Sequence, residues 1–292
     1  MNFKDYTDFI NEKLFDAFLE DEKALDITAK AMLYSLKAGG KRIRPLLTLL
    51  FCEACGGKKE MAQSAAIATE YIHSYSLIHD DLPCMDDDDF RRGSPSCHKK
   101  FGEDIALLAG DALLTLAFEK AADGAKNHEY TAETAVEIIS ILSSFSGYKG
   151  MIGGQALDLL SEGKDIDFDT LKKMDLLKTG KLIKAACIIG CLAAGANENQ
   201  IKSATVFAEN VGLAFQITDD ILDVTGDFDK LGKLTGSDKD NNKSTYVKVL
   251  GLEKSKEYAV TLTKEAINSL DAFPHKKEEL KQLALSLVNR ER

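Results

Sequence analysis

The chain has 292 residues, a formal net charge of -10 and a pI near 5.1. Such an acidic chain lacks the basic surface that non-specific nucleic-acid binding needs, so we expect no nucleic-acid partner. Its longest apolar run, residues 185–196, is too short to cross a bilayer, and the acidic N-terminal segment does not resemble a secretion signal. We therefore expect no integral membrane segment and a cytoplasmic protein.

The composition predicts an all-α protein. Only four prolines interrupt the chain, and Ala, Leu, Lys and Glu dominate it, which favours long helices over strands. No composition break, internal repeat or long linker divides the sequence. We expect a single domain over residues 1–292, built as a bundle of long, mostly antiparallel helices.

The apolar periodicity predicts a series of helices. In chain order they cover about residues 6–19, 25–38, a segment starting near Pro45, 60–80, 101–123, 130–146, 168–195, the region around 211–223, 252–270 and 275–289. Gly39-Gly40 should end the second helix and Pro45 suits the first turn of the next. The segment 225–244 is rich in Gly, Asp, Lys and Asn, which predicts a flexible loop.

The six cysteines include a C-x-x-C at Cys52 and Cys55 and a pair one helical turn apart at Cys187 and Cys191. We expect reduced thiols buried on helices, and no structural disulfide. Cys97-His98 is a weak candidate for a zinc site, because such a site needs a second pair of ligands at suitable spacing.

A basic segment, Lys41-Arg42-Ile43-Arg44, follows the Gly39-Gly40 turn. A glycine turn that leads into a helix presents backbone N–H groups and cationic side chains together, which suits a diphosphate. A solvated basic connector explains the same pattern about equally well.

The first acidic cluster runs from Asp80-Asp81 to four consecutive aspartates at 86–89, and Arg91-Arg92 follow at once. Pro83 ends the helix that precedes them, so the carboxylates should gather at one rim. Taken alone, such a run is more often a solvated acidic loop, with the arginines neutralising it.

A second acidic cluster predicts a metal site. Its members share one stripe of a helix at spacing i, i+3, i+4 and i+7: Gln216, Asp219, Asp220 and Asp223. The remainder of that helix is apolar, so the stripe should be buried, where aspartates need a cation between them. Oxygen ligands without nearby cysteine indicate a hard ion, Mg²⁺ before others.

Together the two clusters resemble the first and second aspartate-rich motifs of the trans-prenyltransferase (isoprenyl diphosphate synthase) family. The resemblance implies an isoprenoid synthase type of helix bundle around a central cavity. It also implies head-to-tail condensation of an allylic diphosphate with isopentenyl diphosphate, with three Mg²⁺ per active site and Mn²⁺ as an alternative. The implied metal ligands are Asp80, Asp81, Asp86, Asp219, Asp220 and Asp223.

Further segments resemble the substrate-binding motifs of the family. They assign isopentenyl diphosphate to Lys41, Arg44, His73 and Arg92. They assign the allylic diphosphate to Arg91, Gln155, Asp158, Lys178, Thr179, Gln216, Lys233 and Lys243. The residues implied in catalysis are Asp80, Asp86, Asp219, Lys178 and Lys233. An isolated histidine such as His73 is more often a core residue than a ligand. Lys181 departs from the family pattern and either adds a phosphate contact or is exposed, and Arg290 and Arg292 suggest plain surface charge.

The product length depends on the helix before the first motif, because in the family the growing tail runs beside it. Tyr75 lies roughly 7.5 Å along that helix from Asp80, with Ser76 next to it, so its ring should stop elongation early. This resembles the bacterial farnesyl diphosphate synthase type, which converts dimethylallyl and geranyl diphosphate to (2E,6E)-farnesyl diphosphate. Tyr75 as a plain core aromatic is the simpler alternative.

Several other functions remain open. A geranyl or geranylgeranyl diphosphate synthase has the same motifs, and a terpene cyclase needs only one diphosphate site. A non-catalytic subunit of a heteromeric prenyltransferase typically loses aspartates. Because family members are commonly homodimers, we expect a homodimer.

Overall fold

Helices make up almost all of the regular structure. The structure, a computed structural model, describes residues 3–18, 26–225 and 244–288. Its α-helices are α1 Lys4–Leu14, α2 Ile27–Lys37, α3 Ile43–Ala54, α4 Gln63–Asp80, α5 Cys97–Phe101, α6 Glu103–Lys126, α7 Ala132–Ser146, α8 Met151–Ser161, α9 Phe168–Asp175, α10 Lys181–Ala193, α11 Glu198–Thr225, α14 Tyr246–Leu250, α15 Leu252–Ser269 and α16 Lys277–Val288. The all-α prediction is confirmed.

Short elements complete the chain. A two-residue hairpin pairs β1 Phe90–Arg91 with β2 Ser94–Pro95 in antiparallel register. Single turns of 3₁₀ helix cover Asp16–Phe18, Lys59–Ala62 and Leu270–Ala272. A π-helical turn, Leu176–Gly180, joins α9 to α10.

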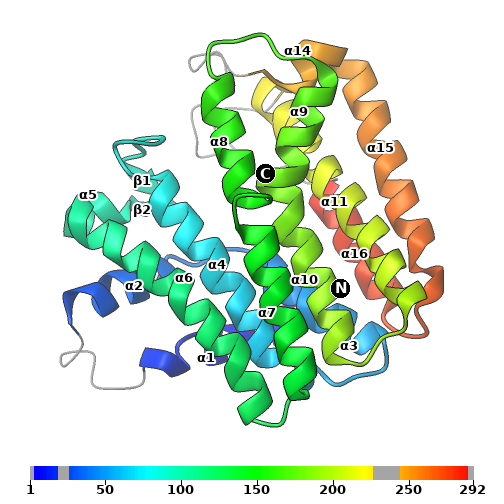
Figure 1. Ribbon diagram of the computed structural model, residues 1–292. Coiled ribbons are helices and arrows are strands. Elements are labelled where there is room, and N and C mark those ends of the chain that lie inside the picture. The colour runs from blue at the N-terminus through cyan, green and yellow to red at the C-terminus, as the bar shows by residue number, and fades with distance from the viewer. Residues whose placement is uncertain (1–2, 19–25, 226–243, 289–292) are drawn as a thin grey trace.

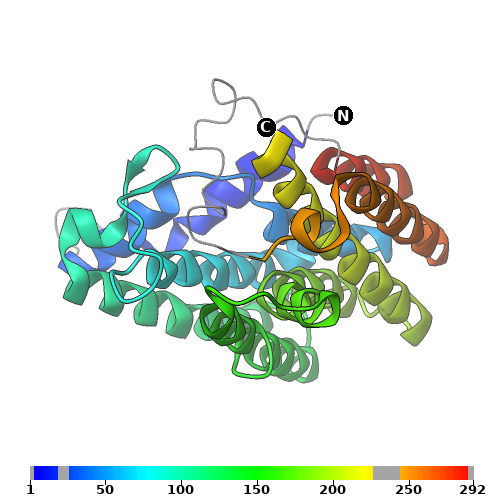
Figure 2. The same cartoon turned by 90° about the horizontal axis from the view of Figure 1, so that it is seen from above.

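The bundle is arranged around α4. This helix packs most extensively against α6, while α10 packs against α3 and α11 against α15. Figures 1 and 2 show α4 running between α6 on one side and the N-terminal helices on the other. At the crossing of α3 and α10 a Cβ on Gly190 would lie 2.2 Å from the Thr48 carbonyl oxygen. The two backbones therefore touch there, which leaves α10 no freedom to shift.

Two hydrophobic clusters hold these helices together. The larger joins α1, α2, α3, α4, α6, α7, α10, α11 and α16, with fully buried rings at Phe51, Tyr71 and Phe207. The smaller joins α9, α11, α14 and α15 around Tyr246. The cavity described below is lined by members of the larger cluster, among them Tyr75, Leu82 and Met151, so this part of its wall belongs to the folded core.

Two predicted helix ranges differ from the structure, and some elements were not predicted. The segment 6–19 is helical only to Leu14, and a 3₁₀ turn follows it. The segment 168–195 is two helices, because the π-turn interrupts it. The helices α8 and α14 and the β1–β2 hairpin were not predicted. Glycines at 150, 153 and 154 weaken the helical signal of α8, and packing against other elements overrides that local preference.

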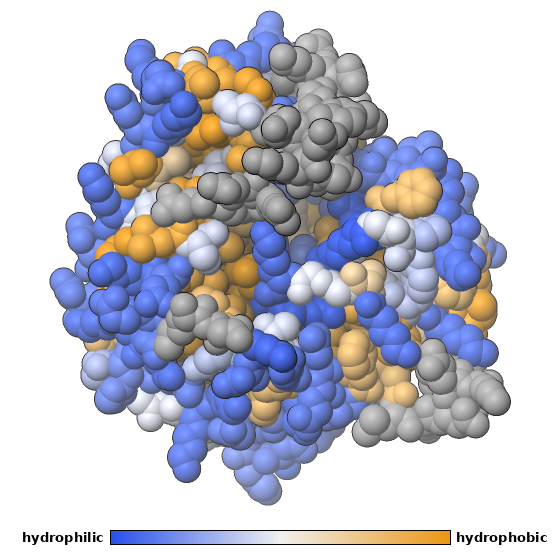
Figure 3. All heavy atoms as spheres, turned by 180° about the vertical axis from the view of Figure 1, so that it is seen from behind, coloured by the Kyte–Doolittle hydropathy of each residue, from blue (hydrophilic) through white to orange (hydrophobic). Residues whose placement is uncertain are grey.

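The outer surface is largely polar on the face shown in Figure 3, where apolar side chains form separate patches. Among the described helices, none is both long and apolar enough to cross a bilayer.

The cysteines are all free thiols. Cys52, Cys97, Cys187 and Cys191 are buried, as expected of small apolar side chains on helices. Within the described ranges, no three His, Cys, Asp or Glu side chains converge to form a metal site by themselves.

Candidate functional site

A cavity of about 770 Å³ opens beside the C-terminal half of α4. Its walls come from α4, α6, α8, the π-turn and α11. Residues that sequence analysis assigned to different roles share this cavity: Arg44, His73, Tyr75, Ser76, Asp80, Gln155, Lys178, Thr179 and Gln216. Apolar side chains from α6, α8 and α11, including Leu114, Leu159 and Phe215, line the remainder. One cavity therefore combines charged groups with an apolar wall.

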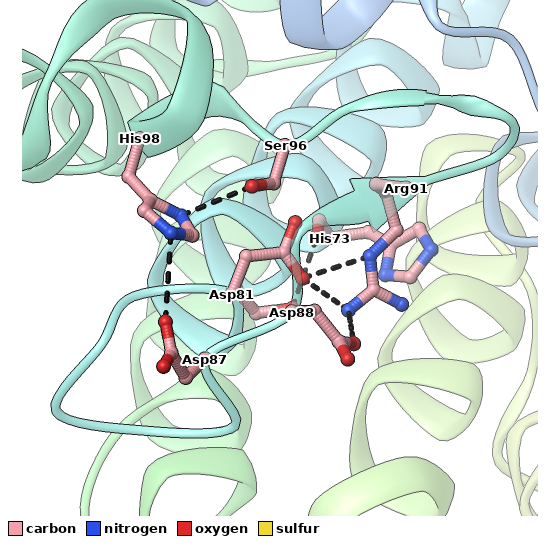
Figure 4. Close-up of polar contacts among 8 residues, drawn as sticks. His73, Asp81, Asp87, Asp88, Arg91, Ser96 and His98 are labelled. Carbon is pink, nitrogen blue, oxygen red and sulfur yellow. Dashed lines mark hydrogen bonds and ion pairs between the residues drawn. The ribbon is translucent and has the colours of Figure 1, made fainter.

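The first acidic cluster forms a rim where α4 ends. The backbone N–H of Asp86 donates to the Asp80 carbonyl over 2.9 Å, which folds the loop back on the helix end. The hairpin then returns Arg91, whose Nε donates to Asp81 over 2.9 Å and whose terminal nitrogen lies 3.0 Å from Asp88 (Figure 4). Asp81 is 2% exposed. Arg91 and Asp81 are thus paired with each other in this structure.

Asp80 is a buried carboxylate among charged neighbours. Burial raises the pKa of Asp80 to about 6; Lys178 and Arg91 act to lower it, and Asp86 and Asp81 act to raise it. The carboxylate oxygens of Asp80, Asp81 and Asp86 are therefore available at one rim. An all-oxygen donor set of this kind fits Mg²⁺, which takes a few carboxylates and completes its shell with water and phosphate oxygens.

His98 lies next to the acidic loop, a contact that sequence analysis missed. Its ring is 6% exposed, its Nδ1 lies 3.1 Å from the Ser96 hydroxyl, and its Nε2 lies 3.8 Å from Asp87 (Figure 4). Asp87 has a left-handed backbone with φ of 49°. His98 thus contacts the side chains of Ser96 and Asp87. No pattern in the sequence predicted its contact with Asp87.

A cationic cluster lies on the other side of the cavity. Burial lowers the pKa of Arg44 to about 10; Glu70 opposes this shift and Arg92 adds to it. The pKa of His73 lies well below its usual value, first through burial and then through Arg44, Arg92 and other arginines. Burial among other cations disfavours the charged forms of these side chains, and a bound anion stabilises those forms. The cluster is therefore suited to bind phosphate.

The Gly39-Gly40 turn is built around Arg92. The Arg92 guanidinium donates to the Gly39 carbonyl, and a Cβ on Gly40 would lie 2.5 Å from the guanidinium carbon. The absence of a side chain on Gly40 therefore makes space for the Arg92 guanidinium. This contact joins positions more than fifty residues apart in the sequence. Lys41, beside this turn, is exposed.

Arg42 has a different role from Arg44, although both belong to the same basic segment. It is 4% exposed and its terminal nitrogen lies 2.7 Å from Glu70. Its other nitrogens donate to the Leu36 carbonyl over 2.6 Å and to Asn11 over 3.1 Å. Arg42 also has a left-handed φ of 50° at the start of α3. It holds the basic turn in place and faces away from the cavity.

Lys178 extends from the π-turn towards both acidic clusters. Its Nζ lies 2.6 Å from Asp158 on α8. Burial lowers the pKa of Lys178, but Asp158, followed by Asp80 and Asp86, raises it more. The next residue, Thr179, donates to the Gln216 side chain over 3.4 Å. The π-turn therefore joins the first acidic rim to α11.

The second acidic cluster occupies α11 as predicted. Gln216 lines the large cavity together with Asp80. Asp220 is 6% exposed and accepts from the Tyr246 backbone N–H over 2.7 Å. It also lines a smaller cavity of about 130 Å³ with Asp158 and Lys178. Asp219 and Asp223 lie half-buried on the same stripe. Both acidic clusters therefore adjoin Lys178.

Tyr75 lies at the wall of the large cavity on α4. It is 4% exposed and its ring meets His79 edge to face at 5.7 Å. Its hydroxyl group is buried without a hydrogen-bond partner among the described residues, as is the side-chain nitrogen of Gln155. Ser76 donates to the His73 carbonyl over 2.9 Å.

The remaining candidates lie elsewhere. Lys181 places its Nζ 4.7 Å above the Phe145 ring and does not line the large cavity. Lys233 and Lys243 fall outside the described residues, as do the C-terminal arginines Arg290 and Arg292.

The chain is similar to several known proteins. The sequence model of a family described as polyprenyl synthetase matches residues 26–284. A farnesyl diphosphate synthase from Micrococcus luteus is 44% identical over 98% of this chain and 96% of its own length. A chloroplastic geranylgeranyl pyrophosphate synthase from Catharanthus roseus is 44% identical over 97% of this chain and 78% of its own. The crystal structure of a Helicobacter pylori geranyltransferase with magnesium and isoprenyl diphosphate superposes with a TM-score of 0.84, at 37% identity over 98% of this chain and 95% of its own.

Proposed function

This chain belongs to the polyprenyl synthetase family, and from that premise we propose that it is a magnesium-dependent farnesyl diphosphate synthase. It is a prenyltransferase of the trans-prenyl diphosphate synthase type. The proposed reaction condenses isopentenyl diphosphate with dimethylallyl and then geranyl diphosphate. The observation that supports it best is the shared cavity, which is lined by Asp80 and Tyr75 of α4 and by Arg44 of α3.

The charged groups divide the cavity into two diphosphate sites. The cationic cluster suits isopentenyl diphosphate, because Arg44 and His73 are buried with too little negative charge around them. The acidic rim suits the allylic diphosphate, which a metal would bridge to the carboxylates. Lys178 reaches the same side and adds a direct cationic contact. Lys41, Arg92, Arg91, Thr179, Gln155, Gln216, Lys233 and Lys243 complete the proposed substrate contacts.

The residues proposed to hold Mg²⁺ are Asp80, Asp81 and Asp86 with Asp219, Asp220 and Asp223. The ion would neutralise the charge that develops on the leaving diphosphate as its C–O bond breaks. Asp81 must loosen its contact with Arg91 to join this set, which would free Arg91 for the allylic diphosphate. The apolar wall keeps water from the allylic cation until the isopentenyl double bond attacks it.

The proposed product length rests on Tyr75. Its ring lines the cavity beside α4, a few residues before Asp80, and we propose that it limits the space for the growing tail. A geranylgeranyl diphosphate synthase is the second candidate, because a relative of that activity is equally similar in sequence. Chromatography of products made from labelled isopentenyl diphosphate, with and without Mg²⁺, separates the candidates. Label remaining in isopentenyl diphosphate under all conditions would contradict any synthase activity.

Changing Tyr75 tests its part in this proposal. We expect Tyr75→Ala to shift the main product beyond fifteen carbons, because the side chain proposed to limit that space is lost. Tyr75→Phe keeps the ring and removes only the hydroxyl group, so its products should stay those of the wild type. An unchanged product profile in Tyr75→Ala would remove Tyr75 as the stop.

A homodimer in the cytoplasm is the form we propose. Apolar side chains are exposed along α6 and α7, with Leu107 at 47%, Leu108 at 51% and Val136 at 68%. A second copy covering this face would also cover the cavity wall at Leu107. Sedimentation equilibrium should give twice the mass of the chain, and Leu108→Glu should lower it to a single chain.

A further inference from the structure

The contact between α8 and the π-turn involves a residue to which the chemistry so far assigns nothing. A Cβ built on Gly154 would lie 2.2 Å from the Lys178 backbone nitrogen and 2.7 Å from its Cα. Ordinary contacts between carbon atoms are about 3.5 to 4.0 Å. The atoms in the way are backbone atoms, which cannot rotate aside as a side chain can. Only glycine fits at this position without displacing the turn.

The π-turn needs this space because it is wider than an α-helical turn. Turns of this kind break the regular helix and are common at functional sites. Leu176–Gly180 bulges towards α8 and presents Lys178 and Thr179 to the large cavity. From the opposite side α11 closes on the same turn, since a Cβ on Gly212 would lie 3.2 Å from the Gly180 Cα. The turn is therefore held between two helices at glycine contacts.

The same face of α8 also holds the lysine side chain. Asp158 follows Gly154 by four residues, which places both on one face of the helix. Its carboxylate lies 2.6 Å from the Lys178 Nζ. One helix face thus sets the backbone of Lys178 through Gly154 and orients its side chain through Asp158.

We propose that Gly154 is a positioning residue of the prenyl transfer reaction, which sets the place of Lys178 and Thr179 by direct contact with the π-turn backbone. The inference deepens the proposed function, because it assumes that Lys178 binds the allylic diphosphate. An added methyl group must displace the turn by about 1 Å, and a shift of this size can reduce the rate on the order of 10²-fold.

The test compares Gly154→Ala with Gly180→Ala, which adds the same methyl group within the turn itself. At Gly180 the new Cβ would meet its nearest neighbour at 3.5 Å, an ordinary contact. In Gly154→Ala we expect kcat/KM for geranyl diphosphate to fall about 10²-fold, with KM for isopentenyl diphosphate within about threefold of the wild type. Gly180→Ala should lose at least ten times less. The proposal would be overturned if KM for isopentenyl diphosphate rose as much as kcat/KM for geranyl diphosphate fell. It would also be overturned if kcat/KM for geranyl diphosphate fell equally in the two variants.

A double-mutant cycle asks whether Gly154 acts through Lys178. If it does, Gly154→Ala should lower kcat/KM for geranyl diphosphate much less in the Lys178→Ala background than in the wild type. In that background the lysine side chain that Gly154 positions is already absent. Fully additive losses would contradict a positioning role.

Hydrogen–deuterium exchange separates this inference from the proposed substrate assignment. Amides of residues 175–181 should exchange faster in Gly154→Ala, whether or not Lys178 binds a diphosphate, and exchange at α3 should not change. Unchanged exchange at residues 175–181 would sink the inference. If Gly154→Ala does not fold, Gly212→Ala presses on the turn from α11 and should produce the same local increase in exchange. Its absence there would sink the inference equally.

Discussion

The acidic rim and the cationic cluster each place one residue on α4, Asp80 and His73, and these two residues show opposite responses to burial. Asp80 and His73 lie two turns apart on this helix, and both are half-buried at the same cavity. Burial among carboxylates raises the pKa of Asp80, whereas burial among arginines lowers that of His73. Each region therefore disfavours its own charge and prefers a ligand of opposite sign. The difference shows how one helix can serve a metal-bridged diphosphate and a directly bound diphosphate.

The largest expected effect comes from the acidic rim. Asp80→Asn removes a carboxylate that we propose holds Mg²⁺, so turnover at saturating substrates should fall on the order of 10³-fold. Titration with Mg²⁺ should show a higher requirement for the metal. Asp87→Asn is the matched control, because that side chain is 59% exposed and asparagine tolerates its left-handed backbone. Comparable losses in the two variants would contradict a special role for Asp80.

The cationic cluster contains one arginine that we expect to act on folding. Arg42→Ala leaves Glu70 buried without its cation, which should lower the free energy of unfolding by about 3 to 5 kcal/mol in urea denaturation. The double variant Arg42→Met with Glu70→Leu removes both charges and should recover most of that loss. A loss below about 1 kcal/mol in Arg42→Ala, within the range of exposed ion pairs, would show that the pair is not a buried support.

Arg44, two residues away, should act on binding. Arg44→Gln removes a cation proposed to contact isopentenyl diphosphate, so its KM should rise about 10- to 100-fold, as for the loss of a hydrogen bond to a charged group. KM for geranyl diphosphate should stay within about threefold. Arg44→Lys keeps the charge but loses the planar fork, and an intermediate KM is expected. A rise of equal size for both substrates would remove the distinction between the two regions.

The smallest effect concerns Asp175, which lies behind the acidic clusters. Burial raises its pKa to about 7, with Asp158 raising it too, while Tyr246 and Lys178 lower it. Between about pH 4 and pH 7 the folded state binds a proton that the unfolded state has lost, so this group makes stability fall as pH rises. Asp175→Asn should therefore be more stable than the wild type at pH 8, on the order of 2 kcal/mol, and nearly equal at pH 4.

Thermal unfolding at the two pH values measures the Asp175 effect. Asp169→Asn, on the same helix, is the matched control, because it makes the same substitution at a side chain that is exposed to solvent. Equal stability of Asp175→Asn and the wild type at pH 8 would contradict a raised pKa.

The helical class and the family could be predicted from the amino-acid order alone, and the same motifs supplied the residues proposed for the site. Helical periodicity depends on neighbours within two turns, so the amino-acid order alone places Gln216, Asp220 and their partners on one stripe. The spacing from Asp80 to Asp86 and the basic turn near Arg44 were sufficient to find the resemblance to known synthases.

Only the tertiary structure decided how neighbouring residues divide their roles. Arg42 and Arg44 occupy similar positions in the sequence, but only Arg42 forms a buried ion pair with Glu70, 28 residues further along the chain. The π-turn has no local signal, because it depends on glycines of α8 and α11 that leave space for its backbone. These contacts join distant segments of the chain. The periodicity of the sequence therefore cannot predict which backbone packs against a given glycine.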